Sequence, residues 1–254
     1  MPKAPGCTDP PTVGRHKPKN LWLLSFITRG LSNNISELGV CEKEYSLDII
    51  LIHEPFLKPK SRVACKIRNN VHLGTDRRDI LGGGTALYYK RSLYCCPIDK
   101  HPLTDLEAAV CRLAMTEHGT LIIAPVYLSP TKKLLQSDLE SLFSLEDIVI
   151  LFADFNSKNV KWKCITTNKN GRKLSSLVGK IEFDVLSLLT PTRFPGNNQH
   201  RPDILGIALV KGVALRLGGI ETLQCLNSDH RLMLLKLDRL MTGDRPNPVK
   251  TIRN

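Results

Sequence analysis

The sequence ILFADFNSKNVKW, at residues 150–162, contains the transition that decides the fold. Four apolar residues run without interruption into Asp154, which is followed by Phe155 and Asn156. A continuous apolar run predicts a buried β-strand, and side chains two residues apart on a strand lie on the same face. We therefore expect Asp154 and Asn156 to project together from a strand end, where α/β proteins usually place their functional groups.

Apolar runs on both sides of this stretch predict an α/β domain. Helical spacing is present at residues 32–43, where Ile35, Leu38 and Val40 are expected to point inward, and also at 134–145 and 171–181. A triple glycine at 82–84 leads into another strand-like run, but it lacks the Gly-Lys-Ser/Thr ending of a nucleotide-binding loop and is interpreted as a tight turn. Further strands are predicted at residues 21–27, 47–54, 108–114, 120–127, 148–156, 203–210 and 231–240.

The composition is that of a globular protein with an excess of positive charge. The chain has 254 residues, of which 42% are hydrophobic, and a formal net charge of +12. This length suits one large domain or two small ones. The basic balance suits a polyanionic partner such as nucleic acid, although a solvated basic surface has the same composition.

The cysteines indicate the cellular compartment, and the composition of the two ends indicates where the folded domain begins and ends. The 8 cysteines include no CxxC pair, which argues against zinc and favours reduced thiols in an intracellular protein. No apolar run is long enough to span a membrane. Residues 1–20 are rich in Pro and Lys and predict a flexible basic arm, 21–238 form the folded domain, and 239–254 are expected to be a loose tail.

Polar residues recur where the predicted strands begin or end. Taken singly, an acid or a histidine there is more often a cap, a turn former or a structural hydrogen-bonding group. Taken together they fit phosphodiester chemistry, because carboxylates bind Mg²⁺, can deprotonate a water, and can orient a histidine toward a phosphate. The set is Glu54, Tyr127, Asp154, Asn156, Asp229 and His230.

The ordered motifs resemble the endonuclease/exonuclease/phosphatase family. More narrowly, they resemble the endonuclease domain at the head of non-LTR retrotransposon polyproteins, jockey-like elements in particular. The resemblance covers roughly residues 21–238. The motifs are HE at 53–54, GGTALYYK at 83–90, APVYLSP at 124–130, ADFNSKNVKW at 153–162, RPDILGIAL at 201–209 and NSDHRL at 227–232.

The resemblance implies a fold, a cofactor and a role for each matching residue. The fold would be an α/β four-layer sandwich of two mixed β-sheets flanked by helices, and the cofactor Mg²⁺ or Mn²⁺. Glu54 matches the metal-binding acid and Tyr127 the phosphate-contacting tyrosine. Asp154 matches the acid that handles the nucleophilic water or the leaving group, and Asn156 its transition-state partner. Asp229 and His230 match the paired carboxylate and histidine.

The same resemblance implies that the partner is DNA. In the retrotransposon branch the domain nicks target DNA, and the new 3′ hydroxyl primes reverse transcription. A nuclear location follows as an expectation, with no membrane and no small-molecule cofactor. The loop from Arg193 to Arg201 is either a solvated turn or a DNA-contacting loop, and Trp162 is expected to pack behind the preceding turn. The sequence leaves the oligomeric state open.

Two positions depart from the family pattern. Ile27 stands where the family has an asparagine that helps to hold the metal, and Gly206 stands where it has an aspartate that orients the histidine. Asp203 matches a different position of the motif. We therefore expect severely reduced hydrolysis. A non-catalytic nucleic-acid-binding remnant is the main alternative, and a phosphatase for small phosphoesters is a third possibility, disfavoured by the basic charge.

Overall fold

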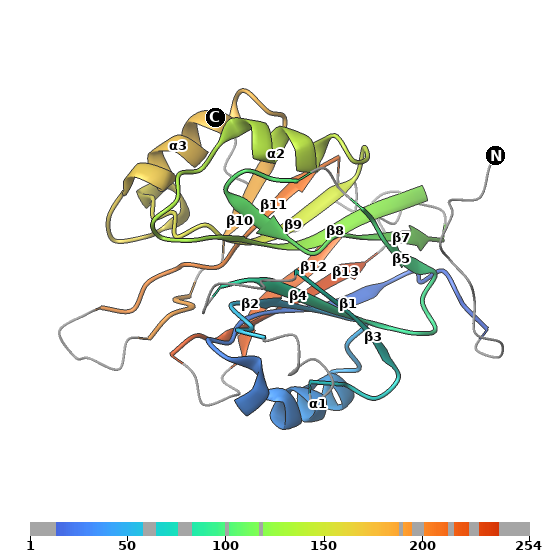
Figure 1. The fold of residues 1–254 in the computed structure, drawn as a ribbon. Coiled ribbons are helices and arrows are strands. Elements are labelled where there is room, and N and C mark those ends of the chain that lie inside the picture. The colour runs from blue at the N-terminus through green and yellow to red at the C-terminus, as the bar shows by residue number, and fades with distance from the viewer. Residues whose placement is uncertain are drawn as a thin grey trace.

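The structure is a computed structural model with two β-sheets packed face to face (Figure 1). It describes residues 14–57, 65–75, 83–99, 102–116, 119–187, 190–194, 201–212, 216–223 and 229–238. Most of the predicted basic arm and the whole of the predicted tail at 239–254 lie outside these residues. No helix within the described ranges is long and apolar enough to cross a membrane.

The first sheet has the order β12-β13-β1-β2-β4-β3. Its neighbouring strands pair antiparallel except β1 and β2, which are parallel. The strands are β1 (Leu21–Ile27), β2 (Ile49–His53), β3 (Asn70–Gly74), β4 (Thr85–Lys90), β12 (Arg216–Leu223) and β13 (Leu232–Asp238).

The second sheet has the order β10-β11-β9-β8-β7-β5, and β6 also pairs with β8. Here β8 and β9 form the parallel pair. The strands are β5 (Cys95–Pro97), β6 (Leu106–Ala108), β7 (Cys111–Met115), β8 (Gly119–Leu128), β9 (Val149–Asp154), β10 (Asp184–Ser187) and β11 (Ile207–Lys211).

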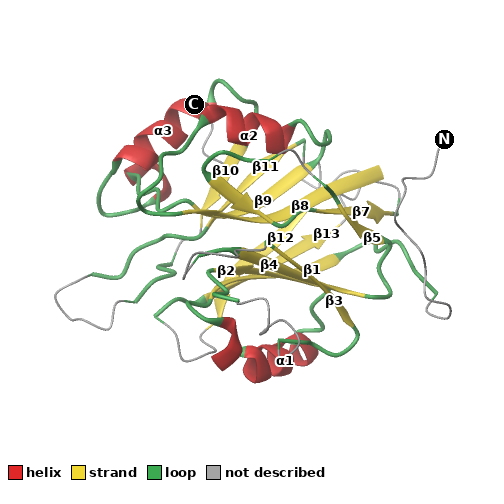
Figure 2. Cartoon of the chain, viewed as in Figure 1, coloured by secondary structure: helices red, strands yellow, loops and turns green. Residues whose placement is uncertain are grey.

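Helices cover the outer faces of both sheets (Figure 2). Helix α1 (Ile35–Glu44) packs on the first sheet, whereas α2 (Gln136–Phe143) and α3 (Lys169–Val178) pack on the second. One apolar cluster fills the space between the sheets, and two others join each sheet to its helices. The predicted four-layer sandwich is therefore confirmed.

The structure corrects several details of the predicted elements. Val40 is 60% exposed, so its predicted inward orientation is wrong, and Cys41 takes the buried position on α1. The predicted strand 108–114 is divided into β6 and β7. The division faces Ala124 and Pro125 of β8, and a proline has no N–H to donate to the ladder. The predicted strand at 203–210 begins only at Ile207.

Candidate active site

The parallel pairs place the ends of four strands beside one another. In the β1–β2 register Ile27 lies opposite His53, and in the β8–β9 register Tyr127 lies opposite Asp154. A hydrogen bond 2.9 Å long joins His53 Nε2 to the Phe152 carbonyl and thereby ties the two sheets together at this end. Glu54 follows β2 directly, so the two sheets bring Glu54, Tyr127 and Asp154 to one edge.

Asp154 is a buried carboxyl group that faces another acid. Its pKa is raised to about 7, first because burial removes the carboxylate from water and second because of the negative charge of Glu54. The Asn156 N–H and the guanidinium groups of Arg29 and Arg193 act in the opposite direction. The two acids, one from each sheet, therefore lie close enough to interact through space.

Asn156 reaches the site by a turn. Strand β9 ends at Asp154, so strand alternation does not place Asn156 as predicted. Its backbone adopts a positive φ of 47°, and its N–H donates to Asp154 Oδ1 at 3.3 Å. The Asn156 side chain donates to the Leu128 carbonyl at 3.1 Å. The turn thus ties Asn156 to the ends of both β8 and β9.

Tyr127 and Trp162 are both buried. Tyr127 lies near the end of β8, between Glu107 of β6 and Asp154 of β9 in the sheet register. Trp162 lies in the apolar cluster under the second sheet, and its indole N–H donates to the Ser157 carbonyl at 3.0 Å. The prediction that Trp162 packs behind the turn is confirmed.

Asp229 and His230 are held at the start of β13 by residues 192–194. The Phe194 N–H donates to the Asp229 carbonyl, and the Arg231 N–H donates to the Thr192 carbonyl. His230 Nε2 lies 3.8 Å from Asp229 Oδ1, which is beyond hydrogen-bonding distance. Burial lowers the pKa of His230 to about 4 although Asp229 acts to raise it, so the imidazole is neutral at pH 7.

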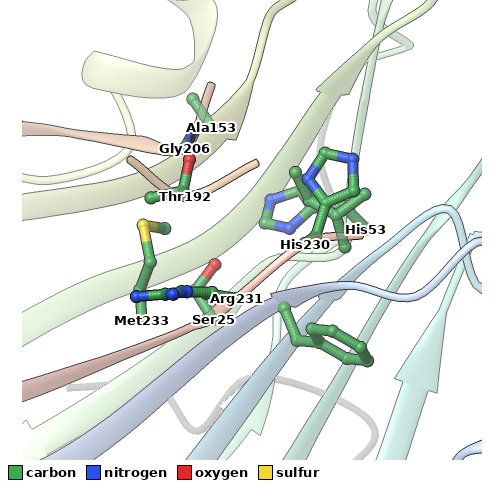
Figure 3. Close-up of a pocket in the computed structure, with 10 residues that line it drawn as sticks. Ser25, His53, Ala153, Thr192, Gly206, His230, Arg231 and Met233 are labelled. Atoms are coloured by element: carbon green, nitrogen blue, oxygen red, sulfur yellow. Dashed lines mark hydrogen bonds between the residues drawn. The ribbon is translucent and has the colours of Figure 1, made fainter. Parts of the chain in front are cut away.

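A small pocket with mostly apolar walls lies beside His230. Its lining includes Ile27, Gly206, His230 and Met233. Figure 3 shows the Met233 side chain turned toward Gly206 and Thr192. A Cβ placed on Gly206 would lie 2.7 Å from the Met233 sulfur. The thioether therefore fills the space that a side chain at position 206 would need.

The sequence did not single out Arg29, which lies at the centre of the predicted set. Its Nη1 donates to Asp229 Oδ2 at 3.0 Å, and its Nε lies 3.9 Å from Glu54 Oε2. A lone arginine after a strand carries no recognisable signal. The contact joins residues 200 positions apart in the chain, so only the tertiary structure could show it.

Arg193 also reaches the site, whereas Arg201 lies on the exposed surface. Arg193 Nε is 3.6 Å from Asp229 Oδ2, and its backbone bridges to both Asp203 and His230. Arg201 is exposed at the other end of the loop, and residues 195–200 lie outside the described part of the chain. The Asp203 side chain forms a 2.7 Å ion pair with Lys158.

The donor set does not fit a divalent metal ion as it stands. Within the described ranges, no three His, Cys, Asp or Glu side chains are grouped closely enough to hold one. Glu54 and Asp154 offer the hard oxygens that Mg²⁺ prefers. The Ile27 side chain offers no oxygen, however, and the Arg29 Nε lies 3.9 Å from Glu54 Oε2. The Arg29 charge therefore opposes the binding of a cation at Glu54.

Comparisons with known proteins confirm the resemblance predicted from the motifs. The family described as endonuclease-reverse transcriptase matches residues 121–234. The RNA-directed DNA polymerase from mobile element jockey of Drosophila funebris is 26% identical over 231 residues, which are 89% of this chain and 24% of that protein. The chain thus spans about a quarter of the length of this curated relative.

Solved structures share the fold. The endonuclease domain of TRAS1, a telomere-specific non-LTR retrotransposon, has a TM-score of 0.68 at 18% identity, with 86% of this chain and 98% of that one covered. The 3′ phosphatase NExo from Neisseria, described as bound to a product DNA hairpin, has a TM-score of 0.60 at 12% identity, with 86% and 99% covered. At these identities the likeness shows the fold alone.

Proposed function

The chain is similar to the endonuclease/exonuclease/phosphatase domains of jockey-like retrotransposon polyproteins, and we propose that it is an endonuclease domain that acts on DNA. We propose further that its rate of hydrolysis is severely reduced. The observation that carries this proposal is the convergence of Glu54, Asp154, Asp229 and His230 on one edge of the sandwich. These residues come from both sheets and are up to 176 positions apart. They are the residue types that phosphodiester hydrolysis requires.

Each residue has a role that its surroundings support. Asp154, with a pKa near 7, can accept a proton from an attacking water. Asn156 lies one turn away and can donate to a phosphoryl oxygen with the hydrogen of its amide that Leu128 does not take. Tyr127 lies beside Asp154 in the sheet register, and the resemblance implies that it contacts the phosphate. His230, neutral at pH 7, can donate a hydrogen bond to the phosphate or the leaving oxygen.

Three features reduce the expected rate. Ile27 cannot contribute an oxygen ligand, and Gly206 leaves His230 without the orienting carboxylate of the family. The positive charge of Arg29 lies near Glu54, with 3.9 Å between Arg29 Nε and Glu54 Oε2. Mg²⁺ or Mn²⁺, which the resemblance implies, would supply charge neutralisation at the phosphate, but no step is assigned to it because the donors do not fit. Groups that act as one unit lose activity together, so these losses do not simply add.

A second candidate function is DNA binding without hydrolysis. The specific observation in its favour is the pair of guanidinium groups, from Arg29 and Arg193, on Asp229 Oδ2. Guanidinium groups are well suited to phosphate recognition. The formal net charge of +12 also favours a polyanionic ligand.

The cellular role proposed here follows from the relatives. A nick made by such a domain would leave a 3′ hydroxyl that primes reverse transcription. The site of action would be nuclear DNA.

The test is nicking of supercoiled plasmid in Mg²⁺ or Mn²⁺, measured beside Asp154→Ala and His230→Ala. Duplex DNA binding is measured in parallel at several salt concentrations. We expect slow nicking that both substitutions abolish, and binding that weakens steeply with salt. Arg112→Ala serves as a matched control, because Arg112 pairs with Glu146 on the surface, away from the site.

The outcomes separate the candidates. Binding without nicking above the level of the two variants supports the non-catalytic domain. Turnover of a small phosphoester, with neither DNA binding nor nicking, supports a phosphatase and contradicts both DNA functions.

A further inference from the structure

The Arg29 side chain is surrounded by the polar groups of the site. Besides its contacts with Asp229 and Glu54, its charge acts on both Asp154 and His230, because it lowers the pKa of each. A single guanidinium therefore interacts with four of the six predicted site residues. Its side chain is half exposed, so it borders the solvent from which a ligand would enter.

The backbone holds Arg29 in this place. Residues 28–31 are bonded to the segment that carries Glu54: the Thr28 N–H donates to the His53 carbonyl, the Gly30 N–H to the Glu54 carbonyl, and the Leu31 N–H to the Pro55 carbonyl. The Thr28 hydroxyl also donates to the Glu54 carbonyl at 3.0 Å. Four bonds thus clamp the two loops together, with Arg29 on one and Glu54 on the other.

The local conformation adds to this constraint. Arg29 has a positive φ of 45°, and Gly30 after it has a φ of 124°. The left-handed conformation is uncommon for residues other than glycine and persists where surrounding bonds impose it. The side chain of residue 29 therefore starts beside Glu54 whichever rotamer it adopts.

A guanidinium and a divalent cation cannot share these acids without repulsion. Arg29 supplies one positive charge both to Glu54, which the resemblance assigns to the metal ion, and to Asp229. A divalent ion at Glu54 would lie within a few ångströms of that charge, where repulsion near a protein surface is substantial.

We propose that Arg29 is a built-in counter-ion of the site, which neutralises Glu54 and Asp229 and competes with a divalent metal ion for Glu54. The proposal rests on the proposed function for the location of the site, but it requires neither hydrolysis nor DNA binding. It assigns to residue 29 the control of metal affinity in this chain.

The experiment measures Mn²⁺ binding to the whole chain without DNA, by the loss of the free Mn²⁺ signal in electron paramagnetic resonance. Arg29→Ala is expected to tighten Mn²⁺ binding by about tenfold, because it removes the competing charge. Arg29→Lys keeps the charge and is expected to change the affinity by less than about threefold. Arg112→Ala, which removes an arginine of similar exposure from an ion pair elsewhere, is expected to have no effect.

A double variant locates the bound ion. Glu54→Gln in the Arg29→Ala background is expected to abolish the gained affinity. Unchanged Mn²⁺ affinity in folded Arg29→Ala would overturn the proposal, and so would a gain that persists in the double variant. Thermal unfolding of each variant shows whether it is folded. Should Arg29→Ala fail to fold, Arg29→Gln carries the same test.

The result is independent of the proposed function. A gain in Mn²⁺ affinity in a chain that neither binds nor nicks DNA supports the counter-ion and contradicts the DNA-directed function. DNA binding or nicking, together with an Mn²⁺ affinity that does not change when Arg29 is replaced, supports the DNA function and contradicts the counter-ion.

Discussion

The Met233 sulfur lies 2.7 Å from the point where a Cβ on Gly206 would stand. Both residues line the pocket beside His230 (Figure 3). The Met233 thioether thus occupies the space that a side chain at position 206 would need. A larger side chain at position 206 requires Met233 to move.

Gly206→Asp is therefore expected to destabilise the fold by about 2–3 kcal/mol, because it overpacks the pocket and takes a carboxylate out of water. Met233→Ala in the same chain makes room for the new side chain. The double variant should be more stable than the sum of the two single changes predicts, by about 1 kcal/mol or more. Urea unfolding of the four chains measures this coupling, and simple additivity would contradict it.

The buried Asp154 carboxylate is expected to cost stability at neutral and alkaline pH. Its pKa is raised in the folded protein, so between pH 4 and 7 the folded state binds more protons than the unfolded chain. Stability from this group is therefore present at low pH and is lost as the pH rises through 7.

Asp154→Asn removes that titration. We expect the variant to gain stability over the parent chain between pH 5 and 8, reaching about 2–3 kcal/mol at pH 8. Urea unfolding in EDTA at each pH measures the difference. A difference that does not change with pH, or that has the opposite sign, would show that burial does not disfavour the charged carboxylate.

Arg201 is expected to contact DNA phosphates. Arg201→Ala should weaken duplex binding and lower the magnitude of the salt slope by about 1, uniformly across sequences. Lys43→Ala is the matched control, because Lys43 is an exposed cation on α1, which covers the outer face of the first sheet. Equal losses in the two variants would show a general effect of net charge and would remove Arg201 from the interface.

Trp162→Phe is expected to lower stability without changing DNA affinity. Trp162 is 1% exposed, and phenylalanine cannot replace its hydrogen bond to the Ser157 carbonyl. We expect a loss of about 1–2 kcal/mol in urea unfolding. Val160→Ala, at a residue that is 62% exposed in the same 3₁₀ turn, should change stability by less than about 0.5 kcal/mol. A selective loss of DNA binding would instead indicate base stacking.

The sequence by itself determined which segments form the inner strands of each sheet. The strands that it predicted from apolar runs, β1, β2, β4, β7, β8, β9, β11 and β13, all lie inside their sheets, where both faces are covered. Such strands are continuous apolar runs because layers pack on both sides of them. The ordered motifs also identified the acids and the histidine of the candidate site.

Only the tertiary structure decided the edges of the sheets and the electrostatics of the site. The strands that were not predicted, β3, β5, β10 and β12, are the four edges, whose short or mixed sequences follow from having a partner on one side only. Arg29 and Met233 took their places through contacts with Asp229 and Gly206, which are distant in the chain. Sequence periodicity indicates which residues of a strand or helix are buried. The contacts of the Arg29 charge and the Met233 sulfur with distant residues depend instead on how the sheets and loops pack together.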